Sequence, residues 1–194
     1  CAWLYWHATK PTVVSCCGRG ENEWLDSLEN PDLHQEAFES LFNIVKMGTS
    51  GEAAIAMRIL GKGYVSNDDS EHLCSELRRI LRYDFVIGNE RRATERREAS
   101  LQSHSIPLLV QLQGVAAIRD LIGLLEVSGT SQAVSLAILE LGSLGKEAAS
   151  AIEVLERLAK NNTRWPFSGA TVRHHQQLAG EAIVQIHTAL KEPR

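Results

Sequence analysis

The chain has 194 residues, of which 44% are hydrophobic and 23% charged, and its formal net charge at pH 7 is −4. This composition is typical of one globular domain with a substantial core, and it gives no general electrostatic reason to expect nucleic acid as a partner. Few aromatic residues, five prolines and many Ala, Leu, Ile and Glu favour helices over sheets. No apolar run approaches the roughly 20 residues that a membrane-spanning helix needs.

The first 22 residues are predicted to be a tail or membrane-proximal linker, because proline and glycine interrupt any periodicity there. The sequence begins at Cys1, followed by Ala-Trp-Leu-Tyr-Trp. We expect one of three origins: the lipid-bearing first residue of a bacterial lipoprotein, the outer end of a cut signal anchor, or an arbitrary boundary. The first two predict a membrane-anchored protein outside the cytoplasm; the third leaves a cytoplasmic location as the alternative.

The four cysteines have no metal-ligand spacing. Cys16 and Cys17 are adjacent, so they would pair with each other only through a strained ring. One of them could bridge to Cys74 in an oxidising compartment, and free thiols are the alternative.

Periodic apolar residues predict a helical domain over 23–190, followed by a short tail at 191–194. Asp68 or Asp69 is expected to cap the fourth helix, and Pro107 to split the segment that follows a polar helix. In chain order, helices are expected near 23–29, 32–47, 52–60, 68–83, 90–103, 115–127, 130–141, 146–160 and 171–190.

The most regular stretch is 130–162, which we interpret as two amphipathic helices folded back on each other across the turn 142–145. The glycine-bounded turn at 48–51 is similar in sequence, so the same turn chemistry is expected at both. The helix at 115–127 aligns with the second helix of this stretch at an offset of 34 residues, which is a helical-repeat period. The last helix then begins a unit whose partner is missing, and it would cap the stack.

With this pattern, the chain resembles HEAT-repeat proteins, most closely the short bacterial HEAT-like repeats related to those of bilin lyases. The residues that carry the resemblance are Ala137-Ile138 to Leu141-Gly142, then Gly145 to Ala149, Ala151-Ile152 and Leu155. The resemblance implies an all-α fold, a short right-handed α-solenoid of about four helical hairpins. The match is poor over 66–105, no proline follows Ala149, and such repeats indicate little about function.

An arginine cluster gives the first candidate site, with Arg92 and Arg96 as possible partner-binding residues. As a nucleic-acid surface it would resemble the basic faces of HEAT-like DNA glycosylases. The carboxylates between Glu76 and Glu98 leave a net charge of only +2, which favours an ordinary solvated helix face. The arginines of the cluster are Arg78, Arg79, Arg82, Arg91, Arg92, Arg96 and Arg97.

The segment Trp165-Pro166-Phe167 gives the second candidate site. Trp165 and Phe167 could anchor a partner at one edge of the repeats, or they could fold back to cover the core. None of the seven histidines forms a convincing metal site, and His175 is expected in the core or at its boundary. The sequence contains no HExxH, paired CxxC, GxSxG or phosphate-binding GxxxxGKS motif.

We therefore expect a non-enzymatic scaffold that binds a protein or peptide on the surface of the repeats, without a catalytic residue, metal or cofactor. Nucleic acid is the less favoured partner, and a membrane is expected only through Cys1 or a removed segment. The alternatives are an accessory enzyme of the bilin-lyase type and a nucleic-acid-binding HEAT-like protein. A concave polar pocket with convergent titratable groups would favour the enzyme.

Overall fold

The computed structural model describes residues 15–82, 93–126, 130–160 and 169–191, and the side chains within these ranges except those of 15 and 93–99. The chain divides into two compact units, Cys1–Val65 and Ser66–Arg194. The described part is helical apart from one pair of two-residue strands, which confirms the all-α prediction.

The first unit begins with a small hairpin in which β1 (Ser15–Cys16) pairs antiparallel with β2 (Arg19–Gly20). Cys17 and Gly18, with φ of 52° and 79°, form the left-handed turn that such a two-residue hairpin requires. Cys16 is fully buried, and the Trp24 indole donates a hydrogen bond to its carbonyl oxygen at 3.0 Å. The part of the predicted tail from residue 15 onward therefore belongs to the folded unit.

Three helices complete this unit: α2 (Glu21–Glu29), α3 (His34–Met47) and α4 (Ser50–Lys62). Helix α3 packs against α2 and α4, as the periodicity predicts. A capping box begins α4, because the Thr49 hydroxyl accepts a bond from the Glu52 amide and the Glu52 carboxylate accepts one from the Thr49 amide at 2.9 Å. This capping starts the helix two residues before the predicted position.

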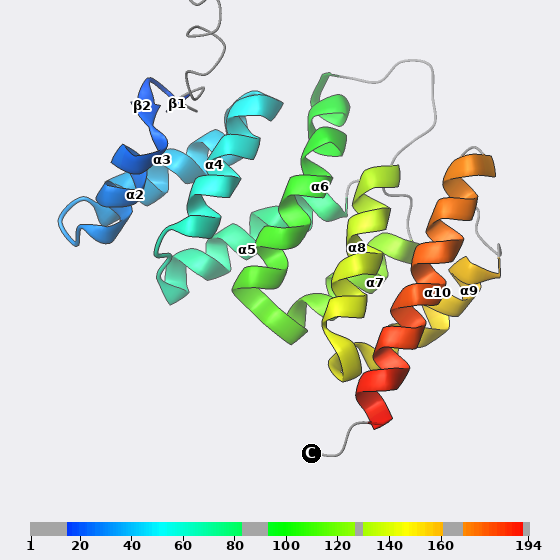
Figure 1. Cartoon of the computed structure of the whole chain (residues 1–194). Helices are drawn as coiled ribbons and strands as arrows, with labels where there is room; N and C mark the ends of the chain where they lie inside the picture. The colour runs from blue at the N-terminus through cyan, green and yellow to red at the C-terminus, as the bar shows by residue number, and fades with distance from the viewer. Residues whose placement is uncertain (1–14, 83–92, 127–129, 161–168, 192–194) are drawn as a thin grey trace, which may run out of the picture. The chain divides into compact units, whose positions relative to one another are not determined.

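The second unit consists of alternating helices that form two layers (Figure 1). Helices α6, α8 and α10 lie side by side, and α5, α7 and α9 form the other layer, with contacts within and between the layers. The elements are α5 (Asn67–Leu81), α6 (Ala93–Gln113), the 3-10 helix η1 (Gly114–Ala117), α7 (Ile118–Glu126), α8 (Ser131–Ser143), the 3-10 helix η2 (Gly145–Ala151), α9 (Ile152–Ala159) and α10 (Gly169–Lys191).

Two predicted helix boundaries in this unit are wrong. Ser66, rather than Asp68 or Asp69, caps α5, because its hydroxyl accepts a hydrogen bond from the Asp69 amide at 3.2 Å. Pro107 does not split the following segment: α6 continues through it. Proline removes one helix hydrogen bond, but the neighbouring Ile106 and Leu109 are fully buried, and their burial outweighs that loss.

The predicted pairing of helices within 130–162 is shifted by one helix. Helix α8 contacts η2, but its main neighbours are α10, α6 and α7, and α9 packs on α10 and α7. The last helix, α10, therefore has two extensive neighbours in α8 and α9, and it is not the first member of an incomplete pair. The sequence turn at 142–145 is real, but the two helices that it joins diverge into opposite layers.

The two glycine-bounded turns also differ in chemistry, contrary to the prediction. Gly145 has a left-handed φ of 58° and begins η2, whereas the turn before α4 uses the Thr49 capping box. The true equivalent of Gly145 is Gly114, whose φ is 53° and which begins η1. Left-handed φ is easy for glycine and strained for other residues, so both glycines have the same role.

The repeat of 34 residues holds in the structure. Ala117 and Ala151 end the two 3-10 helices, and α7 and α9 begin at the next residue. The aligned leucines are buried in both copies: Leu121 and Leu155 at 0% exposure, Leu124 and Leu158 at 3% and 4%. Thus the spacing marks equivalent positions in two structural copies.

The stretch Ser100–Glu126 is long and apolar enough to cross a membrane by length and composition, which the sequence analysis did not detect. The structure breaks it at Gly114 into α6 and α7, which pack against other helices of the unit. Such a core hairpin passes the same test, so the stretch is weak evidence for a membrane span.

Candidate functional site

The residues that the sequence analysis proposed as sites fall outside the described side chains. Cys1, Arg92, Trp165 and Phe167 lie outside the described residues. Arg96 lies within α6, but its side chain is among those not described. Their roles stay predictions.

Three arginines of the predicted cluster are described, and each is paired. Arg78 donates to Asp120 at 2.8 Å and to the Gln113 side-chain oxygen at 2.6 Å. Arg79 pairs with Glu76 at 2.8 Å, and Arg82 reaches Asp120 at 3.5 Å. These three therefore follow the structural interpretation; the carboxylate that the charge count missed, Asp120, comes from α7.

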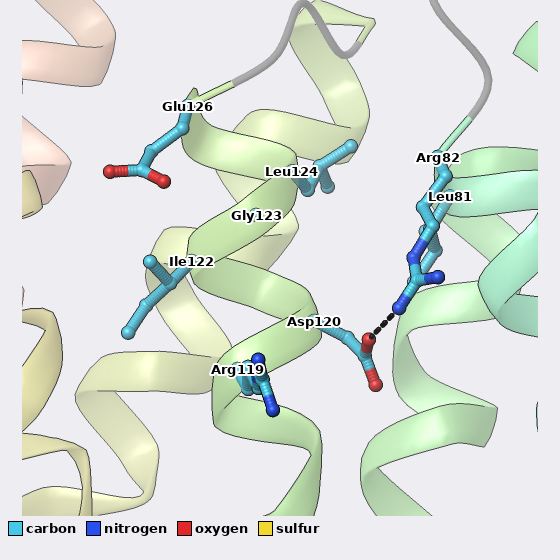
Figure 2. A pocket seen from close by; sticks show the side chains of 8 residues that line it. All are labelled: Leu81, Arg82, Arg119, Asp120, Ile122, Gly123, Leu124 and Glu126. Carbon is cyan, nitrogen blue, oxygen red and sulfur yellow. Dashed lines mark hydrogen bonds and ion pairs between the residues drawn. The ribbon is translucent and has the colours of Figure 1, made fainter.

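Asp120 belongs to a groove that runs over the solvent-facing side of α7, with a volume of about 620 Å³. We call it the α7 groove. Figure 2 shows Asp120 and Arg82 facing each other on one side of α7, Ile122 and Glu126 on the other side, and Gly123 between them. The lining residues are Leu81, Arg82, Arg119, Asp120, Ile122, Gly123, Leu124 and Glu126.

Gly123 keeps the middle of the groove open. A side-chain carbon placed there would meet no atom within 4 Å, so the space above the helix is empty. Leu81 and Leu124 are buried beneath, and Ile122 is half-buried beside it. The floor is therefore apolar and lacks a side chain at its centre.

The charged groups around this floor leave hydrogen-bond donors in excess. Asp120 is compensated by Arg78 and Arg82, and Glu126 by Arg157 at 2.8 Å. Arg82 makes one long contact with a side chain 76% exposed, and exposed Arg119 has no ion-pair partner among the described residues. Each guanidinium offers five N–H donors, so the groove presents unused donors to a ligand, while its carboxylates are already engaged.

A second, shallower hollow lies on α10. It is lined by Gln177, Gly180, Glu181, Val184 and Gln185, and Val184 is 64% exposed. As at Gly123, a carbon added at Gly180 would meet nothing within 4 Å. This hollow lacks arginine, so it provides a comparison for the α7 groove.

His175 confirms the prediction of a core histidine, since it is only 3% exposed. Its Nε2 lies 3.0 Å from the carbonyl oxygen of Ser131, at the beginning of α8. Burial lowers the pKa of His175, the Ser131 contact opposes this change, and neighbouring His174 adds to it. The described residues contain no group of three or more His, Cys, Asp or Glu side chains that could hold a metal ion.

The cysteines in the described part carry free thiols, so a bridge from Cys16 or Cys17 to Cys74 is absent there. Cys16 and Cys74 are buried and Cys17 is exposed. Burial raises the pKa of the Cys16 thiol to about 11, with smaller contributions from Cys17 and Glu52. Such a thiol is protonated at neutral pH and is a poor nucleophile.

Sequence reasoning missed the α7 groove because its members look ordinary one by one. The available signal was Gly123, a glycine on the polar side of an otherwise regular amphipathic helix, at the position where the repeat at offset 34 carries Arg157. Asp120, which aligns with the buried Val154, was a second signal.

Comparisons with protein families, curated proteins and solved structures find no match for this chain. The resemblance to HEAT repeats therefore stays a prediction.

Proposed function

We propose that this protein is a non-enzymatic binding module, a short α-solenoid of HEAT-like helical hairpins that holds a protein or peptide segment in the α7 groove. The two helical layers of the second unit and its repeat of 34 residues support the solenoid. The open floor at Gly123 carries the proposal of binding, because a helix face at this position normally presents a side chain to solvent.

The chemistry of the groove supports binding over catalysis. Asp120 and Glu126 are each held by arginine, which stabilises their charged form and removes them from proton transfer. An apolar floor with a few charged groups at its rim is the usual composition of a site that orients a ligand. The groove suits one or two side chains of a partner more than a large flat interface.

Selection of short random peptides displayed on phage, with the full chain immobilised, tests this proposal. Enriched peptides are then synthesised and titrated against the wild type, Gly123→Gln and Gly180→Gln. Both variants place the same uncharged side chain into open space on a helix, one in the α7 groove and one in the α10 hollow.

We expect enriched peptides to lose about tenfold or more in affinity for Gly123→Gln and to bind Gly180→Gln as they bind the wild type. Failure to enrich any peptide whose binding depends on position 123 would overturn the proposed function. Loss of binding only in Gly180→Gln would move the site to α10 and contradict the assignment to α7.

A further inference from the structure

We propose that the segment held in the α7 groove is an acidic peptide with one apolar anchor residue, and that Arg119 and Arg82 bind its carboxylates. This inference rests on the proposed function and names the chemistry of the partner. It follows from the shape of the floor, the distribution of charge around it and the donors that remain unused.

The apolar anchor follows from the floor of the groove. Gly123 leaves a space that is open to solvent, bounded by Ile122 and underlain by Leu124. Water in this space meets few polar partners, so an apolar side chain that displaces it gains free energy. A Leu, Ile or Met side chain of the partner would reach the helix backbone above Gly123, which any larger residue at that position would block.

The acidic character follows from the charges. The lining contains two arginines and two carboxylates, and Arg78 and Arg157 lie directly behind those carboxylates. These six groups have a net charge of +2 at neutral pH. Asp120 accepts from two arginines and Glu126 from one, so the attraction that a basic peptide would feel is already used.

The two lining arginines have the geometry of receptors for carboxylates. Arg82 projects from the end of α5 and Arg119 from α7, so they come from two elements and approach the groove from different sides (Figure 2). An arginine fork binds a carboxylate through two parallel N–H···O bonds. Two acidic side chains that flank the anchor could therefore be held at once.

The same charges favour a peptide over nucleic acid. A phosphate backbone carries one charge per nucleotide, and it would have to pass Glu126 and also the exposed Glu153 on neighbouring α9. Nucleic-acid surfaces generally extend over a basic stripe, whereas the excess positive charge here is confined to one groove. An acidic peptide needs only two local contacts.

The peptide selection described above also tests this inference, because the composition of the enriched peptides is a separate readout from whether any are enriched. We expect Asp or Glu on at least one side of a Leu, Ile or Met. Fluorescence polarisation of one such peptide should show about tenfold weaker binding to Arg119→Glu, and weaker binding as the salt concentration rises.

Arg173→Glu is the matched control, because Arg173 is an exposed arginine on α10 away from the groove. It should bind the peptide as the wild type does. Enrichment of basic or purely apolar peptides that still depend on Gly123 would overturn the acidic partner while leaving the proposed function intact. Tighter binding of a single-stranded DNA or RNA oligomer than of any peptide, lost in Arg119→Glu, would overturn it in favour of nucleic acid.

Discussion

The segments η1–α7 and η2–α9 are two copies of one structural unit, and their two faces differ in how much they have diverged. Each begins at a left-handed glycine, continues as a 3-10 helix and then becomes an α-helix at an isoleucine. Toward the core, the aligned residues have the same size and burial. Toward solvent, none of the four aligned positions has kept its chemistry: Arg119 aligns with Glu153, Ile122 with Glu156, Gly123 with Arg157 and Glu126 with Lys160.

This difference explains why a groove exists over α7. At the position of Gly123, α9 has Arg157, whose side chain extends to Glu126 of the preceding copy at 2.8 Å. The same backbone therefore supports a filled, ion-paired surface in one copy and an open floor in the other. The core residues determine the fold, and the solvent-facing residues of a single copy determine the site.

The largest effect is expected when the shared core is cut. Leu121→Ala and Leu155→Ala remove equivalent, fully buried side chains, so each should lower the free energy of unfolding by about 2 to 5 kcal/mol. Urea denaturation followed by circular dichroism measures both. If one substitution costs almost nothing while the other costs several kcal/mol, the two copies are not equivalent in packing.

A smaller effect is expected at Asp120, where the copies differ in the core boundary. Asp120→Ala leaves Arg78, whose side chain is only 33% exposed, without its carboxylate, and should lower the free energy of unfolding by about 1 to 3 kcal/mol. Glu126→Ala breaks an exposed pair with Arg157 and should cost at most about 1 kcal/mol. Equal losses in the two variants would show that Asp120 has no special structural role.

The pH dependence comes from the two neighbours that contact the beginning of α8. On the α6 side, the amide of Gln102 accepts a hydrogen bond from the Thr130 backbone at 3.0 Å; on the α10 side, His175 contacts Ser131. Burial lowers the pKa of His175 from its ordinary 6.5, so the unfolded chain binds this proton at a higher pH than the folded chain. The contribution to stability is therefore unchanged above about pH 6.5 and falls as the pH decreases below it, by at most about 1.4 kcal/mol per pH unit.

Thermal unfolding between pH 7.5 and pH 5 measures this change in the wild type, His175→Gln and His72→Gln. The first variant should lose part of the pH dependence, because it has no imidazole at the buried position. His72 is exposed on α5, so its replacement should leave the dependence as in the wild type. An identical pH profile in all three proteins would contradict the role of His175.

The smallest effect is expected at two helical glycines. Gly123→Ala fills open space on a helix and should raise the free energy of unfolding by about 0.5 to 1 kcal/mol. Gly142→Ala should lower it, because the new methyl group would crowd the Gln185 side chain and lie 3.2 Å from the Ala182 side chain of α10. Comparison of the two midpoints of urea unfolding decides whether Gly123 is kept for function at a cost in stability.

Much of the fold could be predicted from local chemistry. The apolar period placed most helices within a few residues, and the alignment of Leu121 with Leu155 identified a structural repeat. The errors have non-local causes. Pairing of α9 with α10 depends on contacts across the chain that no period of a single helix contains, and Pro107 remained inside α6 because tertiary burial outweighed its local preference.

The candidate site was harder to predict because it is defined by a missing side chain and a carboxylate from another helix. The arginines around Arg78 stand out as a run in the sequence, but their pairing with Asp120 does not. Gly123 is one of 14 glycines, and only the comparison with Arg157 shows that its position normally carries a long side chain. Trp165 and Phe167, which stand out most clearly in the sequence, lie outside the described residues.

The central claim, that α7 carries the binding site because it lacks the side chain that α9 has, is tested most directly by nuclear magnetic resonance. An enriched acidic peptide is titrated into the isotope-labelled full chain while the backbone amide signals of Gly123 and Gly180 are followed. We predict that the Gly123 signal shifts progressively and saturates with the dissociation constant found by polarisation, and that the Gly180 signal stays in place. A shift confined to Gly180, or saturation of binding with no change at Gly123, would contradict the account.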